Sequence, residues 1–287
     1  MINILYIGNC QVKAYSEILH INNSNVNVIE CYNTNINEYE LLTIIQNTNI
    51  IITQHINDDY KNKPFLSTKF LLENCKKDCI IIILDVCYFD FYHIDADYKL
   101  FNDKLLQQPI SYHYNNMIYC YKNNLSINYY IENFVNNLNL KTLDELETIA
   151  INNITELKNR YECNIERYKD YKLNINIETC YEFIRDNYKE KYLFYFKNHP
   201  SKYVLQYNCN KIIEILKKYL LIDYCINYDI DPLNGIQCII YKCVQKCVNF
   251  DINNYVPSIN LPPYLMLSGI NETIELYYKT YDKINFI

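Results

Sequence analysis

Short apolar runs alternate with segments of helical spacing in the first part of the chain. The β-branched, apolar runs have the length of strands and lie at residues 2–7, 26–31, 49–53 and 79–84. The segments between them, at residues 11–19, 38–46 and 64–75, space their apolar positions as on one face of a helix. Because strands that alternate with helices form βαβ crossovers, the pattern predicts a central parallel sheet covered by helices on both faces.

The pattern changes around residues 120–190, where longer, polar-rich helical segments predominate. The clearest of them, at residues 142–161, has one apolar stripe made of Leu143, Leu146, Ala150, Ile154 and Leu157. A strand at residues 192–196 is expected to return to the sheet, and a helix follows it at residues 202–219. We therefore interpret residues 1–287 as a single α/β domain, a Rossmann-like three-layer fold with a helical insertion around 120–190 and an irregular C-terminal tail at 257–287.

Charge and cysteine content narrow the function classes. The chain has 27 Lys and Arg against 33 Asp and Glu, a net charge of -6, which is the wrong sign for a nucleic-acid partner. No run reaches the 18 or so apolar residues of a membrane span. Thirteen cysteines, an odd number without a signal peptide, predict reduced thiols in the cytoplasm, or in the host cytoplasm if the source is a virus. The tightest cysteine group, Cys238, Cys243 and Cys247, lacks a second ligand cluster, so no metal site is expected.

Polar residues follow the predicted strands, where parallel α/β sheets bind their ligands. The first strand is followed by Gly8, Asn9, Cys10 and Gln11, the third by Gln54 and His55, and the strand at 192–196 by Asn198 and His199. Gly8 marks either a plain tight turn or a backbone that needs positive φ or close ligand approach. We expect these residues to meet at one edge of the sheet.

Two of these residues have the chemistry of a catalytic site. Cys10 stands near the start of a helix, where exposed N–H groups and the helix dipole lower a thiol pKa, although most of the cysteines are expected to fill the core. His199 precedes Pro200, which suits the first position of a helix, so His199 is expected near a helix N-terminus. We rank His55 below His199 as a candidate catalytic residue, because His55 could instead support the residues that contact the ligand.

Four motifs in order resemble a known family. ILYIGNCQ at 4–11, ITQHINDDYK at 52–61, YFDFYHID at 88–95 and FYFKNHPSKYVL at 194–205 are similar to the capsular polysaccharide biosynthesis enzymes of the WcbI type. That family is related in outline to the SGNH/GDSL hydrolase fold. The resemblance extends from residue 4 to about residue 205 and implies an acetyltransferase that uses coenzyme A or acetyl-CoA and acts on a sugar, a sugar nucleotide or a glycan.

The resemblance also implies roles for individual residues. Cys10 stands where the hydrolase serine would stand, His199 is implied as the general base, and Asn9 as a donor to the oxyanion. The residues implied to contact coenzyme A are Gly8, Asn9, Cys10, Gln11, Lys13, Gln54, Lys61 and Asn198. One departure is Phe196, which occupies the position of the acid that orients the hydrolase histidine.

Two mechanisms and two other functions stay open at this point. The acyl group passes either directly from the thioester to the acceptor, the favoured route, or through an acetylated Cys10. The alternatives to a transferase are an SGNH-like esterase or deacetylase and a non-catalytic glycan- or nucleotide-binding module. The missing acid before His199 counts against hydrolysis. The acceptor sugar and the oligomeric state do not follow from the sequence.

Overall fold

The computed structural model describes residues 2–21, 26–31, 36–219, 224–251, 257–261 and 265–286. Contacts within the chain define two compact units. The first, named here the sheet unit, comprises Met1–Tyr88, Asn153–Asn187 and Asn198–Leu233, and the second, the tyrosine-rich unit, comprises Phe89–Asn152, Tyr188–Lys197 and Asn234–Ile287. A single domain over residues 1–287 stays a prediction.

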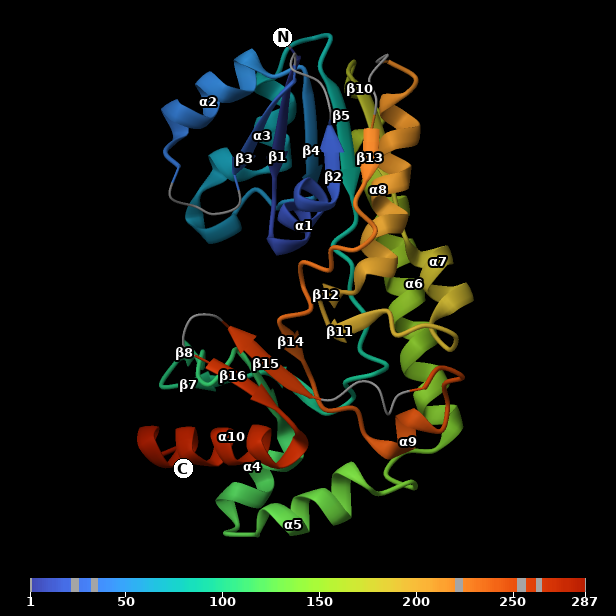
Figure 1. The fold of residues 1–287 in the computed structure, drawn as a ribbon. Helices are drawn as coiled ribbons and strands as arrows, with labels where there is room; N and C mark the ends of the chain where they lie inside the picture. The colour runs from blue at the N-terminus through green and yellow to red at the C-terminus, as the bar shows by residue number, and fades with distance from the viewer. Residues whose placement is uncertain are drawn as a thin grey trace. The chain divides into compact units, whose positions relative to one another are not determined.

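The sheet unit is built on a parallel sheet of five strands in the order β10-β5-β4-β1-β3 (Figure 1). These strands are β1 (Ile2–Ile7), β3 (Val26–Cys31), β4 (Ile50–Gln54), β5 (Ile80–Leu84) and β10 (Asn174–Glu178). Its helical segments are α1 (Cys10–Ile18), α2 (Glu38–Asn47), η1 (Tyr60–Asn62), η2 (Pro64–Leu66), α3 (Thr68–Asn74), the end of α6 (Leu143–Tyr168), α7 (Tyr181–Asn187) and α8 (Lys202–Leu216). The short strands are β12 (His199–Pro200) and the antiparallel pair β2 (Leu19–Ile21) and β13 (Tyr224–Ile226). The predicted α/β class with a central parallel sheet is confirmed.

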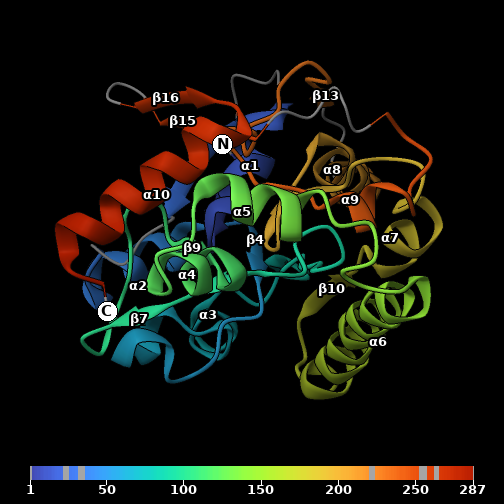
Figure 2. The ribbon, with the colours of Figure 1, turned by 90° about the horizontal axis from the view of Figure 1, so that it is seen from below.

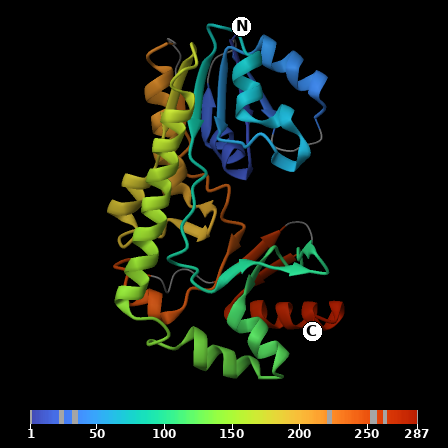
Figure 3. The ribbon, with the colours of Figure 1, turned by 180° about the vertical axis from the view of Figure 1, so that it is seen from behind.

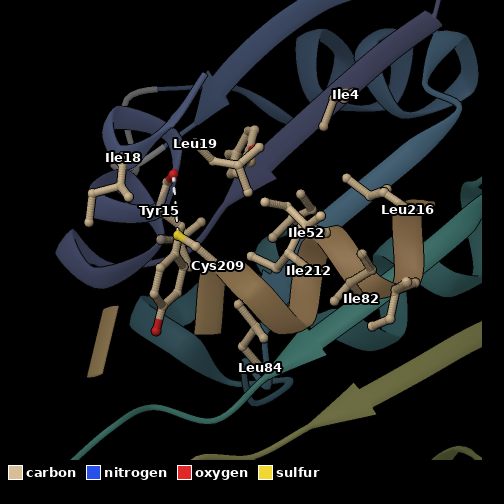
Figure 4. Close-up of a cluster of buried hydrophobic side chains, with 14 of the residues drawn as sticks. Ile4, Tyr15, Ile18, Leu19, Ile52, Ile82, Leu84, Cys209, Ile212 and Leu216 are labelled. Carbon is tan, nitrogen blue, oxygen red and sulfur yellow. Dashed lines mark hydrogen bonds between the residues drawn. The ribbon is translucent and has the colours of Figure 1, made fainter. Parts of the chain in front are cut away.

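Helices cover both faces of this sheet, as the sequence predicted. Alternate residues of β1 point to opposite faces, so that Ile4 packs with α1 and α8 (Figure 4), whereas Leu5 packs with α2 and α3 on the face seen in Figure 3. Strands β4 and β5 lie inside the sheet and are buried along their whole length. Burial on both faces explains why these strands are continuous isoleucine runs instead of alternating patterns.

The fifth strand of the sheet corrects one prediction. It is β10, which lies inside the region predicted as a helical insertion, while residues 194–196 form β11 (Phe194–Phe196), which is not part of this sheet. The strand β10 alternates polar and apolar residues and is half-buried along its length, as expected at a sheet edge. It therefore lacks the apolar run by which the inner strands were identified.

The tyrosine-rich unit contains short strands and several helices. Its strands are β6 (Ala96–Tyr98), β7 (Leu100–Phe101), β8 (Lys104–Leu105), β9 (Tyr112–Tyr114), β11, β14 (Ile236–Gln237), β15 (Ser258–Leu261) and β16 (Leu265–Ser268). Its helical segments are α4 (Asn115–Lys122), α5 (Ile127–Tyr130), η3 (Ile131–Val135), the start of α6, α9 (Lys242–Gln245) and α10 (Ile270–Ile284). Figure 2 shows α10 beside α4 and α5, which it contacts.

The predicted irregular tail is wrong for the described part of residues 257–287. Strands β15 and β16 pair there, and α10 extends over 15 residues. Ile274, Tyr277 and Tyr281 are buried on one stripe of α10, so the helix is stabilised by packing that a tail on its own does not provide. Within the residues that the structure describes, no helix has the length and apolar character needed to span a membrane.

Candidate functional site

The carboxyl ends of β1 and β4 form the centre of the candidate site. From β1 the chain proceeds to β3 on one side of it, and β4 lies on its other side. A reversal of this kind opens a crevice at the carboxyl ends of the two central strands, where α/β proteins bind ligands. The GNCQ loop, residues 8–11, leaves β1 at this place, and Gln54 and His55 lie at the end of β4.

Local chemistry determines how the GNCQ loop turns into α1. Asn9 is the N-cap of α1, and its Oδ1 accepts a hydrogen bond of 2.9 Å from the backbone N–H of Gln11. Gly8 does not have positive φ. A Cβ at this position would lie 2.5 Å from Val12 Cγ2 and 3.2 Å from Gln54 Oε1. Gly8 is therefore required because the neighbouring side chains leave no room for a Cβ.

Gln11 joins three separate segments and is fully buried. Its Nε2 donates to the backbone carbonyls of Cys87 and Asn198, both at 2.8 Å. Its Oε1 accepts from the backbone N–H of Cys87 at 2.9 Å and from Gln54 Nε2 at 3.1 Å. Both carboxamide atoms of Gln11 are thus used inside the protein, so this residue organises the site instead of presenting donors to a phosphate.

Gln54 is buried as well and joins three of the strand ends. Its Oε1 accepts a long bond of 3.4 Å from the backbone N–H of Asn9, and its Nε2 donates to Gln11 and, at 3.4 Å, to the carbonyl of Asp85. The loops after β1, β4 and β5 are therefore held together by two neutral carboxamides. Of the predicted residues, Asn9, Gln11, Gln54 and Asn198 are brought together by these bonds.

Cys10 is the first residue of α1 and is exposed. The partly buried surroundings of the sulfur raise the pKa of the thiol, although the backbone N–H groups of Cys10 and Gln11 act in the opposite direction. The predicted lowering of this pKa by the helix N-terminus is wrong, because desolvation outweighs the two N–H groups. Cys10 is thus mainly a neutral thiol at pH 7.

His199 lies in β12, next to Asn198, whose carbonyl accepts from Gln11. Helix α8 begins at Lys202 with Ser201 as its N-cap, so the prediction that Pro200 is the first helical residue is wrong by two positions. Burial lowers the pKa of His199 to about 4, and the imidazole is neutral at pH 7. Gln11 bonds to Asn198. Cys10, which precedes Gln11 in the chain, and His199, which follows Asn198, therefore lie at the same edge of the sheet.

His55 has a structural partner set. Arg167 Nη1 lies 2.6 Å from His55 Nε2 and can only donate to it, Asn57 Oδ1 lies 2.9 Å from the same nitrogen, and His55 Nδ1 lies 2.5 Å from Tyr168 Oη. Burial and the Arg167 guanidinium lower the pKa of His55. His55 is therefore a neutral residue whose ring contacts Arg167, Asn57 and Tyr168.

The two lysines implied to contact coenzyme A are exposed. Lys13 lies one turn into α1 and pairs with Glu17 at 3.4 Å. Lys61 lies in η1 with its ammonium 5.3 Å from the ring centre of Tyr60. An exposed ion pair of this kind holds its lysine weakly, so that Lys13 can still bind a phosphate.

A second feature of this edge, the α6 cavity, was missed by sequence reasoning. It has a volume of about 550 Å³ and lies between the ends of β4 and β5 and one face of α6. Asp85 and His55 line it from the strand ends, and α6 contributes Glu156, Asn159, Arg160, Cys163, Asn164 and Arg167. The sequence contains a signal for it, because the chain has three arginines and two of them, Arg160 and Arg167, line this cavity.

Asp85 is the buried acid of this cavity, with 4 % of its surface exposed. Burial raises its pKa to about 7, against the opposing effects of Thr179 and Arg160.

No cluster of three or more His, Cys, Asp or Glu side chains able to hold a metal ion occurs in the described ranges.

Comparisons with known proteins agree with the fold and with the family that the motifs resemble. The profile of a family described as "Polysaccharide biosynthesis enzyme WcbI" matches residues 3–217. The solved structure of WcbI, a polysaccharide biosynthesis enzyme, superposes on this chain with a TM-score of 0.77 at 16% sequence identity. The superposition covers 98% of this chain and 90% of the WcbI chain. That structure is described as native protein without a disulfide bond between coenzyme A and one of its cysteines. A search of the curated proteins finds no match.

Proposed function

This chain belongs to the WcbI family of polysaccharide biosynthesis enzymes, and from that premise we propose that it transfers an acetyl group from acetyl-CoA to a sugar. The observation that carries the proposal is the exposed Cys10 thiol at the N-terminus of α1, in the GNCQ loop at the carboxyl ends of β1 and β4. The similar WcbI structure is described as the form without a disulfide bond between coenzyme A and one of its cysteines. A thiol at the place where ligands enter an α/β sheet suits the thiol end of that molecule.

The residues of this edge fit coenzyme A. The exposed Cys10 side chain and its backbone N–H are available to the thioester end, whereas the N–H groups of Gln11, Val12 and Lys13 donate to Asn9. The exposed lysines 13 and 61 are available to its phosphates, and Lys13 lies on the same helix as Cys10. Gln11 and Gln54 support this site from behind, through the bonds that hold its loops.

We propose His199 as the general base. Its neutral imidazole can accept a proton from the sugar hydroxyl or amine at pH 7, and it can then pass that proton to the departing thiolate. Bound acetyl-CoA supplies an activated carbonyl carbon. Asn9 Oδ1 is engaged by Gln11, so Nδ2 is the donor that its amide offers to the oxyanion, together with the backbone N–H of Cys10.

The raised pKa of Cys10 favours direct transfer over an acetylated cysteine. A thiolate is the nucleophilic form, and desolvation makes it scarce at neutral pH. In direct transfer Cys10 shapes the thioester site and no thiolate is needed. Substitution by serine therefore separates the two routes, because direct transfer survives it with a changed KM, whereas a covalent route loses kcat.

The first test is binding of coenzyme A and acetyl-CoA to the reduced protein by calorimetry. We expect the wild type to bind both ligands, Cys10→Ala to bind more weakly, and His199→Ala to bind acetyl-CoA nearly as well as the wild type. Cys225→Ala, at another exposed cysteine, is the matched control and should bind as the wild type does. No binding at millimolar concentration would refute the proposal.

The second test is release of the coenzyme A thiol in the presence of sugar acceptors. His199→Ala is expected to lower kcat at least a hundredfold, the usual contribution of a general base, with a small effect on KM for acetyl-CoA. Thiol release that does not depend on any acceptor would identify a hydrolase instead. Binding without turnover of any acetyl donor would favour a binding module.

A further inference from the structure

The α6 cavity contains a buried acid that the proposed reaction does not use. Asp85 lines this cavity, and in the part of the chain that the structure describes its Oδ2 has no hydrogen-bond partner. A buried carboxylate oxygen without a partner is costly for a protein to keep. Such an oxygen suits a ligand that brings its own hydrogen-bond donor, for example a hydroxyl group.

The arginines of the cavity differ in their partners. Arg160 Nε bonds to Glu156 Oε1 at 2.8 Å, so its charge is compensated. Arg167 donates from Nη1 to two neutral acceptors, His55 Nε2 and Asn164 Oδ1, and no carboxylate pairs with it among the described residues. A guanidinium held by neutral groups keeps its charge for an anionic ligand, and its planar shape suits phosphate.

A second, smaller hollow of about 260 Å³ adjoins the cavity at the same residues. It shares His55, Asn57 and Arg167 with the α6 cavity and is also lined by Asp58 and by Lys69, whose ammonium lies 4.0 Å from Glu73 Oε1. Arg167 therefore lines both hollows, and in the smaller one Lys69 and Asp58 carry opposite charges, so Arg167 is the cation on which the argument rests. On the side of the α6 cavity, Asn159 and Asp85 offer the amide and carboxylate groups that bind hydroxyls.

From this arrangement we propose that the α6 cavity binds the acceptor as a sugar phosphate ester, with the phosphate at Arg167 and the hydroxyls at Asp85 and Asn159. The assignment of this ligand as the acceptor rests on the proposed transferase function. Gln54 connects the two places, since it bonds to Gln11 of the GNCQ loop and to the carbonyl of Asp85. A sugar in the cavity thus lies one strand away from Cys10.

The test is calorimetric titration of the full chain with glucose 1-phosphate, UDP-glucose, glucose and inorganic phosphate. At least one phosphorylated sugar should bind, and which of the two binds better separates a simple sugar phosphate from a nucleotide sugar. Arg167→Met should weaken that binding about tenfold or more, the usual effect of losing a charged hydrogen bond. Arg185→Met is the matched control, because Arg185 is exposed and pairs with Asp186 outside the cavity.

Two further variants keep the test decisive if Arg167→Met is unstable. Asn159→Ala should weaken binding of the phosphorylated sugar several-fold, and Asp85→Asn should weaken it while inorganic phosphate binds as before. Equal affinity of Arg167→Met and Arg185→Met for the phosphorylated sugar would overturn the proposal. Inorganic phosphate that binds as tightly as the sugar phosphate would also overturn it, as would loss of coenzyme A binding in Arg167→Met with unchanged sugar binding.

The two proposals fail in different ways. If the wild type binds coenzyme A and no phosphorylated sugar, the cavity proposal alone is wrong. If the wild type binds a phosphorylated sugar through Arg167 and does not bind coenzyme A, the transferase is wrong and the sugar phosphate site stands.

Discussion

Replacement of Gln11 by alanine is expected to lower the free energy of unfolding by about 4 kcal/mol. The side chain is fully buried and makes four hydrogen bonds, of 2.8, 2.8, 2.9 and 3.1 Å. Each buried bond contributes about 1 kcal/mol net, and the partners left behind on Cys87, Asn198 and Gln54 cost a similar amount each if they stay unpaired. A water molecule that enters the vacated space would recover part of this loss, so we take the lower sum.

The measurement is urea unfolding followed by circular dichroism. Gln11→Glu is the shape-matched variant, and it should be destabilised as well, because a carboxylate cannot donate to the carbonyls of Cys87 and Asn198. Gln46→Ala is the control, since Gln46 is exposed on α2, and its effect should stay within about 0.5 kcal/mol. A loss below about 1 kcal/mol for Gln11→Ala, at an unchanged denaturant slope, would refute the role of this carboxamide.

Three more predictions concern the same edge of the sheet. Gly8→Ala should lower the free energy of unfolding by about 1–3 kcal/mol, because its Cβ would lie 2.5 Å from Val12 Cγ2. Adding Val12→Ala should reduce that loss, measured by urea unfolding. An unchanged loss in the double variant would contradict the steric reason. Burial lowers the pKa of His199 from 6.5 to about 4, so the unfolded chain binds the proton first and native stability falls as the pH drops from 6.5 to 4. His199→Gln should flatten that part of the stability profile, and an equally steep profile would show that another group is responsible. Burial raises the pKa of Asp85 from 3.8 to about 7, so native stability falls as the pH rises between these values; Asp85→Asn should be more stable than the wild type at pH 8 and similar below pH 4, and no gain at pH 8 would count against this assignment.

Several elements of the fold could be predicted from the sequence alone. Strands β1 and β3 have the bounds that were predicted for them. Both ends of α1 and the C-terminal end of α2 differ from the predicted bounds by one residue. Their apolar runs and helical stripes are bounded by polar and glycine residues, so local pattern is sufficient. The same reasoning failed for β10 and α10, whose residues are half-buried or amphipathic and become ordered by packing on other parts of their unit.

The candidate site was predicted in part, for a physical reason. The carboxyl end of a parallel strand is where ligands bind, so the GNCQ loop, Gln54 and His199 could be selected from strand positions. Strand position does not predict which hydrogen bonds each of these side chains makes. Gln11 was expected to contact coenzyme A, yet its carboxamide is consumed by Cys87, Asn198 and Gln54, which come from distant parts of the sequence.

The sequence by itself determined the α/β class, the order of the first strands and helices, and the edge of the sheet at which polar residues gather. Only the tertiary structure decided that Arg167 and Asp85 line the same cavity and that burial, against the effect of the helix N-terminus, raises the pKa of Cys10. The reason is that periodicity depends on neighbours a few residues apart in the chain. Desolvation, cavities and hydrogen bonds between loops depend on residues that are far apart in the chain and close in space.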